Sequence, residues 1–509
     1  QEVSTVAQVP LMENLPKGFM AVPPGRRSFK WRNDQPASLI FVMALDEGNP
    51  DTVVPFRDEV FQLEAPFNEI PRSMLKTQNR FSSIVWGNKN LAIVYDYWWN
   101  TRNKKTYLFN PALPDGGIDL LFDQNYQDAY NDPGSFITRK NKLGQKVLAL
   151  KGSRAYLKGD GFSDEGQFPF LDEINLKSKI KNRLYQSDYK NKLERFIDYD
   201  IDENQLLVRI ESPNDYPNYF IRDFDQGDLK QMTQFENPFI SIKDIHKEVI
   251  SYKRADGLEL SATLYLPVGY DKEKKEKMPM ILWAYPREFK DPSSAAQKTS
   301  NSNTFTYPNY GSPIYWVTKG YVILDRASFP ILGVGDTEPN DTFIKQLVGN
   351  AKAAIDAADA LGYIDRKRVA VGGHSYGAFM VAHLLSNSDL FAAGIARSGA
   401  YNRTLTPFGF QSEQRSYWEA PEIYYNMSPF MHADKMKTPL LLTHGEADNN
   451  SGTYPMQSIR YFNALKGLGA EVRLVLLPKE SHGYRAKENI LHLLWEQDQW
   501  LEKYVKNKD

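Results

Sequence analysis

The sequence of 509 residues has no cysteine, which excludes disulfide bonds, thiolate catalysis and cysteine-ligated metal sites. It also has no run of about 18 apolar residues, so we expect no membrane-spanning helix. Net charge is nearly absent, because 62 Lys and Arg residues face 63 Asp and Glu residues. A chain this close to neutrality has no bulk charge that would attract nucleic acid or an anionic membrane. The function of this chain must therefore be carried by local motifs.

The first residues, Gln-Glu-Val-Ser-Thr-Val, lack the charged and apolar regions of a secretory signal, so we expect no targeting peptide in this sequence. The length is sufficient for two or three domains with a large buried core. The 29 Tyr and 28 Phe residues favour an architecture rich in β-strands.

The first half of the chain consists of short extended runs separated by turns rich in Asn, Asp, Gly and Pro. Examples lie at residues 38–43, 91–95, 146–150 and 205–210, and the pattern recurs about every 50 residues. Such a recurrence predicts the blades of a β-propeller, with an open antiparallel sheet or sandwich as the alternative. About four blades fit into this half. We therefore expect a β-propeller-type, apparently partial domain over residues 1–245.

The second half, residues 246–509, alternates apolar strands with helices. Strands are expected at residues 278–285, 321–324, 368–372, 393–396, 440–443 and 472–477, and helices at 350–361, 378–385 and 487–504. Near-continuous apolar strands separated by helices predict a mostly parallel, doubly wound sheet that is covered on both faces.

The motif Gly373-His-Ser375-Tyr-Gly377 lies between an expected strand and an expected helix. This is the context of a nucleophile elbow, a sharp turn that exposes a serine. Side chains in place of Gly373 and Gly377 would collide with the strand or the helix. The start of the helix also presents backbone N–H groups that can stabilise an oxyanion. We predict that Ser375 is a nucleophile; the alternative is a packed turn residue.

A serine nucleophile needs a general base, because its hydroxyl is inert at pH 7. The chain has seven histidines, which permits a choice by elimination. His482 lies in a loop after an expected strand and before the last helix, where this fold places its base. The others lie beside the serine, within helices, at a strand end or in connecting segments: His246, His374, His383, His432, His444 and His492. We predict His482 as the base and a packing or turn role for His444.

The acidic member of such a triad lies between serine and histidine in chain order, after a strand. Residues 443–450, Thr-His-Gly-Glu-Ala-Asp-Asn-Asn, are in this position. Asp448 is the predicted acid and Glu446 the alternative. Its role is to orient the imidazole and to stabilise the imidazolium.

Three motifs resemble those of the prolyl oligopeptidase family of serine peptidases: residues 372–380, 444–450 and 480–484. Residues 394–410, 448–453 and 462–467 resemble the glutamyl endopeptidase branch of that family, which is known from plastids and bacteria. The resemblance is strong from residue 247 onward and weaker upstream. It implies an α/β-hydrolase domain preceded by a β-propeller, and cleavage of peptides or short unfolded segments after glutamate. Family members carry seven or eight blades, so we expect this chain to begin within the propeller.

The resemblance also implies roles for further residues. The oxyanion donors would be the hydroxyl of Tyr285 and the backbone N–H of Tyr376. Asn450 matches a position that binds a substrate carbonyl group. A substrate glutamate needs a cation, and Arg397 and Arg403 both follow the expected strand 393–396. Surface solvation or a structural salt bridge is the alternative for each arginine.

These features together predict a serine peptidase with a Ser375–Asp448–His482 triad, peptide substrates, and no metal or organic cofactor. The alternatives are a dipeptidyl or acylaminoacyl peptidase of the same family, an α/β-hydrolase esterase, and a binding scaffold with a relic hydrolase domain. An extracytoplasmic (periplasmic) or organellar compartment is favoured over the cytosol. The sequence does not indicate an oligomeric state.

Overall fold

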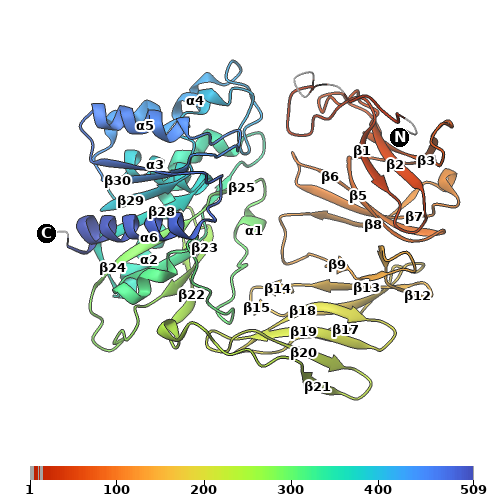
Figure 1. The fold of residues 1–509 in the computed structure, drawn as a ribbon, viewed down its shortest axis with the longest axis horizontal. Coiled ribbons are helices and arrows are strands. Elements are labelled where there is room, and N and C mark those ends of the chain that lie inside the picture. Colours follow the sequence, from red (N-terminus) through yellow and green to blue (C-terminus); the bar gives the residue numbers. More distant parts are fainter. Residues whose placement is uncertain (1–4, 10, 12–14, 508–509) are drawn as a thin grey trace. The chain divides into compact units, whose positions relative to one another are not determined.

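The computed structural model describes residues 5–9, 11 and 15–507. The chain divides into two compact units. The first is Gln1–Ile210 with Pro217–Gln234, and the second is Glu211–Tyr216 with Phe235–Asp509. Residues 235–245, which the sequence assigned to the first domain, therefore group with the second unit. Figure 1 shows strands throughout the first unit and alternating strands and helices in the second.

The first unit contains four antiparallel sheets, each formed from strands that follow one another closely in the chain. The first sheet contains β1 (Arg27–Trp31), β2 (Ser38–Ala44), β3 (Asp58–Glu64) and β4 (Arg72–Thr77), and the second contains β5 (Arg80–Asn88), β6 (Leu91–Trp98), β7 (Asn103–Phe109) and β8 (Ile118–Asn125). The third contains β9 (Ser135–Phe136), β12 (Leu150–Lys151), β13 (Arg154–Gly159), β16 (Phe170–Asn175) and β17 (Lys181–Gln186). The fourth contains β18 (Leu193–Asp200), β19 (Gln205–Glu211), β20 (Asn218–Asp223) and β21 (Asp228–Gln231). Two small hairpins join β10 (Thr138–Lys140) to β11 (Lys146–Leu148) and β14 (Phe162–Ser163) to β15 (Gly166–Gln167).

Side-chain alternation explains why these segments form strands. In β19, Leu206, Val208 and Ile210 are buried, whereas the residues between them are half-buried. This period of two places one face of the strand against a core and leaves the other at the surface. The first unit thus consists mainly of antiparallel sheets with this alternation.

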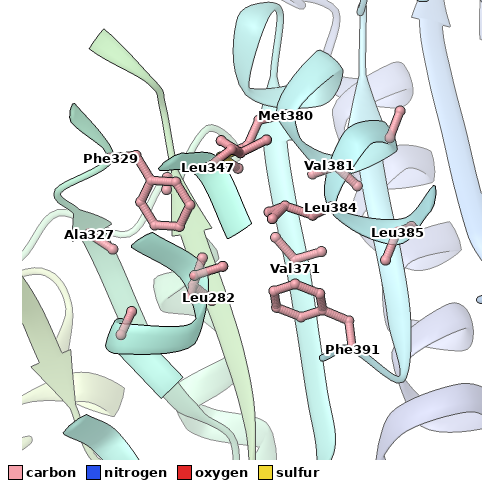
Figure 2. Close-up of a cluster of buried hydrophobic side chains, with 14 of the residues drawn as sticks. Leu282, Ala327, Phe329, Leu347, Val371, Met380, Val381, Leu384, Leu385 and Phe391 are labelled. Carbon is pink, nitrogen blue, oxygen red and sulfur yellow. The ribbon is translucent and has the colours of Figure 1, made fainter. Parts of the chain in front are cut away.

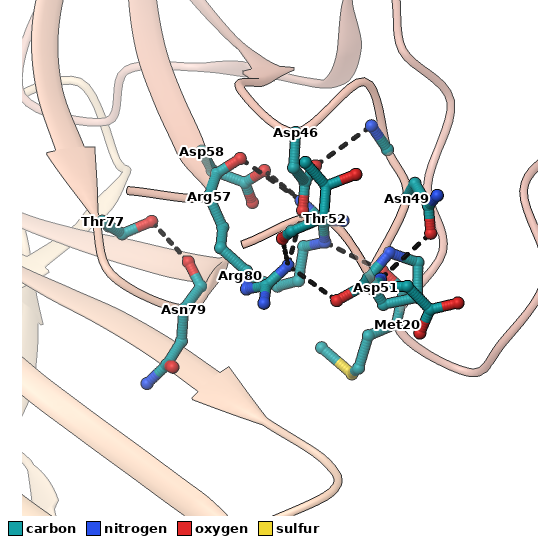
Figure 3. Close-up of polar contacts among 12 residues, drawn as sticks. Met20, Asp46, Asn49, Asp51, Thr52, Arg57, Asp58, Thr77, Asn79 and Arg80 are labelled. Atoms are coloured by element: carbon teal, nitrogen blue, oxygen red, sulfur yellow. Dashed lines mark hydrogen bonds and ion pairs between the residues drawn. The ribbon is translucent and has the colours of Figure 1, made fainter. Parts of the chain in front are cut away.

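A buried ion-pair network ties β5 to the first sheet (Figure 3). The Arg80 guanidinium contacts the carboxylates of Asp46 and Asp58 at 2.8 and 3.1 Å. It also donates a hydrogen bond to the carbonyl oxygen of Met20 at 2.8 Å. Arg57 pairs with the other oxygen of Asp46 at 2.8 Å. Removing one partner from such a buried network leaves an uncompensated charge, so these residues fix how the two sheets meet.

The second unit is built on an eight-stranded sheet in the order β22-β23-β26-β24-β28-β29-β30-β31. Its strands are β22 (Lys247–Lys253), β23 (Glu259–Tyr265), β24 (Met278–Ala284), β26 (Val322–Ala327), β28 (Ile364–His374), β29 (Ala393–Arg397), β30 (Leu440–Gly445) and β31 (Val472–Leu477). The pairs β22–β23 and β23–β26 are antiparallel, and the remaining pairs are parallel. A short parallel pair, β25 (Arg287–Phe289) and β27 (Pro330–Leu332), lies beside it. The α-helices are α1 (Pro292–Ala295), α2 (Phe343–Ala360), α3 (Tyr376–Asn387), α4 (Pro421–Asn426), α5 (Met456–Gly467) and α6 (Lys487–Leu501).

Apolar side chains on both faces of this sheet explain why its central strands read as continuous hydrophobic runs. On one face, Leu282 and Val371 pack with Met380 and Leu384 of α3 (Figure 2). On the opposite face, α6 contributes to a second cluster that includes Ile281 of β24. Neighbouring residues of one strand thus face different helices, which is the packing of a doubly wound parallel sheet.

Several expected elements differ in extent from the structure. The largest difference is in helix α2, which begins at Phe343 and not at residue 350. Strand β28 begins at Ile364 and not at Arg368, because polar residues 365–368 lie in a bulge between two registered segments. Helix α6 ends at Leu501, and a π-helical turn continues the chain over Glu502–Lys506. Among residues 5–9, 11 and 15–507, no helix has both the length and the apolarity to cross a membrane.

Helix α3 carries a buried histidine that should make stability depend on pH. The ring of His383 packs edge-on against Phe379, and burial lowers the pKa of His383 from 6.5 to about 3. The folded-state pKa lies below the unfolded-state value, so the stabilisation is complete above about pH 6.5 and is lost as the pH falls. We expect this residue to remove about 2 kcal/mol from the free energy of unfolding between about pH 6.5 and pH 4.5.

Denaturant unfolding of the wild type and of His383→Leu at both pH values checks this prediction. Leucine does not titrate, so the variant should lose less stability than the wild type on acidification. Equal losses in the two proteins would contradict the prediction.

Candidate active site

The turn between β28 and α3 holds Ser375 in a strained conformation. Its φ of 59° and ψ of −116° place a residue with a side chain in a region that favours glycine. The backbone N–H of Ser375 donates a hydrogen bond to the carbonyl oxygen of Arg397 in β29, at 2.8 Å. The carbonyl oxygen of Ser375 accepts from Ala378 and Phe379 in the first turn of α3. The strain is therefore balanced by hydrogen bonds from the neighbouring strand and helix.

Two glycines make this turn possible. A Cβ atom on Gly373 would lie 2.4 Å from the carbonyl carbon and oxygen of Gly377. A Cβ atom on Gly377 would lie 2.9 Å from the carbonyl oxygen of Ala284 in β24. Both obstacles are backbone atoms that cannot move aside without shifting β24 or α3. The collisions expected from the sequence are thus present on both sides of Ser375.

Ser375, His482 and Asp448 form a continuous hydrogen-bonded chain. His482 Nε2 lies 2.9 Å from Ser375 Oγ, and His482 Nδ1 lies 2.8 Å from Asp448 Oδ2. Ser375 follows β28, Asp448 follows β30 and His482 follows β31, and the carboxyl ends of these parallel strands lie at one edge of the sheet. The imidazole can therefore take the hydroxyl proton at one nitrogen while the carboxylate holds the other.

The carboxylate of Asp448 is kept ionised by its surroundings. Burial would raise the pKa of Asp448, but hydrogen bonds from His444 and His482 outweigh burial and hold it at about 2. The backbone N–H of Asn450 donates to the other carboxylate oxygen at 2.9 Å. Asp448 thus carries its charge throughout the neutral range, as an acidic partner of His482 requires. The alternative acid, Glu446, is exposed, and its backbone N–H donates to the carbonyl oxygen of Leu477 at 2.9 Å.

His374 lies next to Ser375 in the sequence but is not its base. Its ring centre is 4.9 Å from that of His482. Burial and the nearby His482 lower the pKa of His374 to about 4. His374 is therefore neutral at neutral pH, and its ring packs beside that of His482.

Two donors converge near Ser375 at the positions implied for an oxyanion hole. Tyr376 is the first residue of α3, where backbone N–H groups have no acceptor within the helix. Tyr285 follows β24, and its ring packs edge-on against that of Tyr376 at 5.9 Å. Burial raises the pKa of Tyr285, an effect that a hydrogen bond with Ser375 partly offsets. The Tyr285 phenol therefore keeps its proton and can donate a hydrogen bond to an oxyanion.

A cavity of about 310 Å³ opens beside Ser375. Its wall contains Tyr285, Ser375, Tyr376, Ala400, Arg403, Thr406, Gly409, Phe410, Gln411, Asn450, Ser451, Gly452 and Thr453. Ser375, both candidate oxyanion residues, Arg403 and Asn450 thus surround one cavity. Arg397 does not line it.

Arg403 is a buried cation on the cavity wall. It begins the short helical turn Arg403–Leu405, and only 3% of its surface is exposed. Its guanidinium lies 4.1 Å from the ring centre of Phe379 and 4.7 Å from that of Phe410. Burial lowers the pKa of Arg403 to about 10. No residue in the described part of the chain accepts a hydrogen bond from this guanidinium.

Arg397 is equally buried, but its guanidinium is occupied within the protein. It donates to the carbonyl oxygen of Tyr310 and, at 2.7 Å, to Gln497 Oε1. It also stacks on the ring of Trp283 at 4.5 Å. The expectation that Arg397 binds substrate is not supported by this geometry, because its donors point into the protein. Its contribution to the site is the backbone carbonyl that holds Ser375 N–H.

Comparisons with known proteins match this geometry. Residues 345–508 match the prolyl oligopeptidase family. Over 99% of its length the chain is 42% identical to a probable chloroplastic glutamyl endopeptidase of Oryza sativa and to one of Arabidopsis thaliana. Residues 345–508 belong to the prolyl oligopeptidase family. It spans about half the length of these relatives, 55% of the rice protein and 54% of the Arabidopsis protein.

Solved structures confirm the expected fold class, an α/β-hydrolase domain preceded by a β-propeller-type domain. The uncomplexed acylaminoacyl peptidase of Pyrococcus horikoshii aligns with a TM-score of 0.62 at 18% identity, over 95% of this chain and 71% of its own. Dipeptidyl peptidase 4 of Porphyromonas gingivalis aligns with a TM-score of 0.61 at 15% identity, over 94% of this chain and 74% of its own.

Two further residues at the site were not predicted from the sequence. Glu288 in β25 accepts a hydrogen bond from the Tyr376 hydroxyl at 2.5 Å and so holds the ring beside the elbow. His444, expected to have a packing or turn role, contacts the carboxylate of Asp448. The four-residue spacing from His444 to Asp448 was the available signal. Among the described residues, no group of three or more His, Asp or Glu side chains is placed to hold a metal ion.

Proposed function

We propose that this chain is a serine peptidase that cleaves peptide bonds after glutamate. The observation that carries the proposal is the Arg403 guanidinium, which lies on the same cavity wall as Ser375 and has no acceptor among the described residues. Glu288 acts electrostatically on Arg403, but a buried cation without a hydrogen-bond acceptor is still unfavourable in the free protein, and a substrate carboxylate would supply that acceptor. A glutamate side chain in this cavity would supply that carboxylate while its carbonyl group faces the serine.

In the proposed mechanism, His482 takes the proton of the Ser375 hydroxyl as the serine attacks the carbonyl carbon after glutamate. The resulting oxyanion is held by Tyr376 N–H and Tyr285 O–H. His482 then returns its proton to the leaving amine. Water, deprotonated by the same imidazole, releases the acyl group from Ser375. Asp448 stabilises the imidazolium in both steps, and no metal or organic cofactor is needed.

The geometry of arginine suits the proposed selectivity. A planar guanidinium offers parallel donors that match both oxygens of a carboxylate. The rings of Phe379 and Phe410 pack against the Arg403 guanidinium and restrict its motion. Little side-chain freedom of Arg403 is therefore lost when a substrate carboxylate binds. An uncharged glutamine in the same place would leave the cation without compensation. Asn450, which also lines the cavity, is proposed to bind a carbonyl group of the substrate backbone.

The printed names of the rice and Arabidopsis relatives support this proposal, since both are called probable glutamyl endopeptidases. Both are also called chloroplastic, which supports an organellar compartment for this chain within the wider expectation of an organellar or extracytoplasmic one.

A cleavage-site profile on a mixed peptide library tests the proposal. The protein is incubated with peptides that contain every residue on the amino side of internal bonds, and new termini are identified by mass spectrometry. We expect cleavage mainly after glutamate, and none with Ser375→Ala. Products formed by removal of amino-terminal dipeptides or acylated residues would instead identify a dipeptidyl or acylaminoacyl peptidase. Hydrolysis of short esters without any peptide cleavage would identify an esterase.

A further inference from the structure

A second imidazole lies against the carboxylate of the triad. His444 is the penultimate residue of β30 and is fully buried, and its Nε2 atom lies 3.1 Å from Asp448 Oδ2. The same carboxylate oxygen is 2.8 Å from His482 Nδ1. Asp448 is therefore held between two imidazoles, one of which reaches the nucleophile and one of which does not.

The hydrogen-bond partners of His444 fix which nitrogen carries the hydrogen. Its Nε2 atom faces two acceptors, the Asp448 carboxylate and the carbonyl oxygen of Thr453 at 2.7 Å. Nε2 must therefore be protonated and act as a donor. Its Nδ1 atom lies 2.7 Å from Ser458 Oγ in α5, a hydroxyl that can donate or accept. The ring is thus clamped between α5 and the loop that follows β30, and it donates toward Asp448 in either protonation state.

Thr453 extends this arrangement to the catalytic histidine. Its carbonyl oxygen accepts from His444, while its hydroxyl lies 3.1 Å from His482 Nδ1 and 3.3 Å from Asp448 Oδ2. Thr453 also lines the cavity beside Ser375. One buried ring therefore fixes both the acid of the triad and a part of the cavity wall.

We infer that His444 is a positioning residue, which holds the Asp448 carboxylate and the Thr453 carbonyl group so that His482 keeps its orientation toward Ser375. The inference rests on the proposed serine peptidase mechanism. A purely packing role would not require both ring nitrogens to meet polar partners. An apolar replacement would leave the carbonyl oxygen of Thr453 and one face of a buried carboxylate without a donor.

The charges around His482 determine how its protonation would respond. Asp448 follows β30, His374 ends β28, Arg397 ends β29, and Tyr484 follows β31, and each acts electrostatically on this cluster. Without the hydrogen bond from His444, fewer donors stabilise the negative charge of Asp448. The carboxylate then stabilises the imidazolium of His482 more strongly. The catalytic imidazole should then become neutral only at a higher pH.

The test measures the rate at which a fluorophosphonate labels Ser375 between about pH 5 and pH 9. This reaction needs the serine and its base but no knowledge of the natural substrate. With His444→Leu we expect labelling to slow by about 10- to 100-fold, the range for a slightly misplaced catalytic group. The pH at which the rate reaches half of its maximum should rise by roughly half a unit to one unit. His444→Gln, whose amide can donate from near the place of Nε2, should recover most of the rate and the wild-type midpoint.

His383→Leu is the matched control, because it also replaces a fully buried histidine and should leave the rate and midpoint unchanged. If His444→Leu labels at the wild-type rate and midpoint, or if its rate falls only with the folded fraction at an unchanged midpoint, the inference is overturned. It is also overturned if His444→Gln labels as slowly as the leucine variant. Should His444→Leu not fold, Ser458→Ala decides: slower labelling with a raised midpoint supports the clamp, and wild-type behaviour refutes it. A wild-type protein that is not labelled at all contradicts the proposed mechanism itself.

Discussion

Replacing Ser375 with alanine is expected to lower the rate of peptide hydrolysis by about 10⁶-fold, and replacing His482 in the same protein should lower it little further. The hydroxyl and the imidazole are 2.9 Å apart and act as one unit, because the base has nothing to activate without the serine. Hydrolysis of a fluorogenic peptide by the two single variants and the double variant measures this. Losses that multiply in the double variant would mean that the two residues act independently, which contradicts the proposed mechanism.

The same position offers a stability control. Ser375 has a φ of 59°, which alanine retains at the same strain and glycine adopts freely. Ser375→Gly should therefore be as inactive as Ser375→Ala but more stable, by about 1 kcal/mol. Denaturant unfolding of the two variants measures the difference. A glycine variant that is less stable than the alanine variant would show that the turn stores no strain.

The arrangement of the triad could be predicted from the sequence because each member follows a strand with a visible apolar run. The carboxyl ends of parallel strands share one edge of the sheet, so Ser375, Asp448 and His482 had to approach one another. The two glycines at the elbow were equally informative, although only one of the obstacles is local in the chain. A Cβ atom on Gly373 would meet the backbone of Gly377, whereas a Cβ atom on Gly377 would meet the carbonyl oxygen of Ala284 in the neighbouring strand β24.

The role of His444 could not be predicted in this way. It ends an apolar strand, where a packed or turn residue is the ordinary interpretation. What distinguishes it is Ser458 on α5 and the carbonyl group of Thr453, and both contacts depend on how the loop after β30 folds back. The start of β28 was predicted too late in the chain for a similar reason. Ile364 pairs with Met278, but the polar residues 365–368 separate it from the apolar run that begins at Val369.

Arg397 and Arg403 were also indistinguishable in the sequence, since both follow the strand at residues 393–396. Their difference comes from distant partners. Gln497 in α6 and the carbonyl oxygen of Tyr310 take up the donors of Arg397, whereas the Arg403 guanidinium reaches the cavity. The two arginines therefore serve as a matched pair of substitution sites for testing the preference for glutamate.

Arg403→Gln is expected to lower kcat/KM for peptides with glutamate before the bond by about 10²- to 10³-fold, the effect of removing one partner of a buried charge pair. Peptides with glutamine at that position should be cleaved at least as well as by the wild type, because the uncharged amide no longer faces a cation. Arg403→Lys keeps the charge but loses the planar pair of donors, so it should recover only part of the activity.

Arg397→Gln is the matched control: it removes an equally buried cation, and we expect lower stability with an unchanged preference for glutamate. Parallel kinetics on the glutamate and glutamine peptides measure all three variants. Equal losses on the two peptides with Arg403→Gln would assign this arginine a structural role.

Stability provides an independent check on the function of Arg403. Burial lowers the pKa of Arg403 to about 10, below its value in the unfolded chain, so the charged form is disfavoured by folding at neutral pH. Replacing it with methionine, which fills similar space between Phe379 and Phe410 without charge, should therefore raise the free energy of unfolding by about 1 kcal/mol while abolishing the preference for glutamate. Denaturant unfolding and the two-peptide assay on the same preparation measure both effects. A residue kept for stability would show the opposite sign, a less stable methionine variant with its selectivity intact. The buried cation is explained by substrate recognition only if stability rises as selectivity is lost.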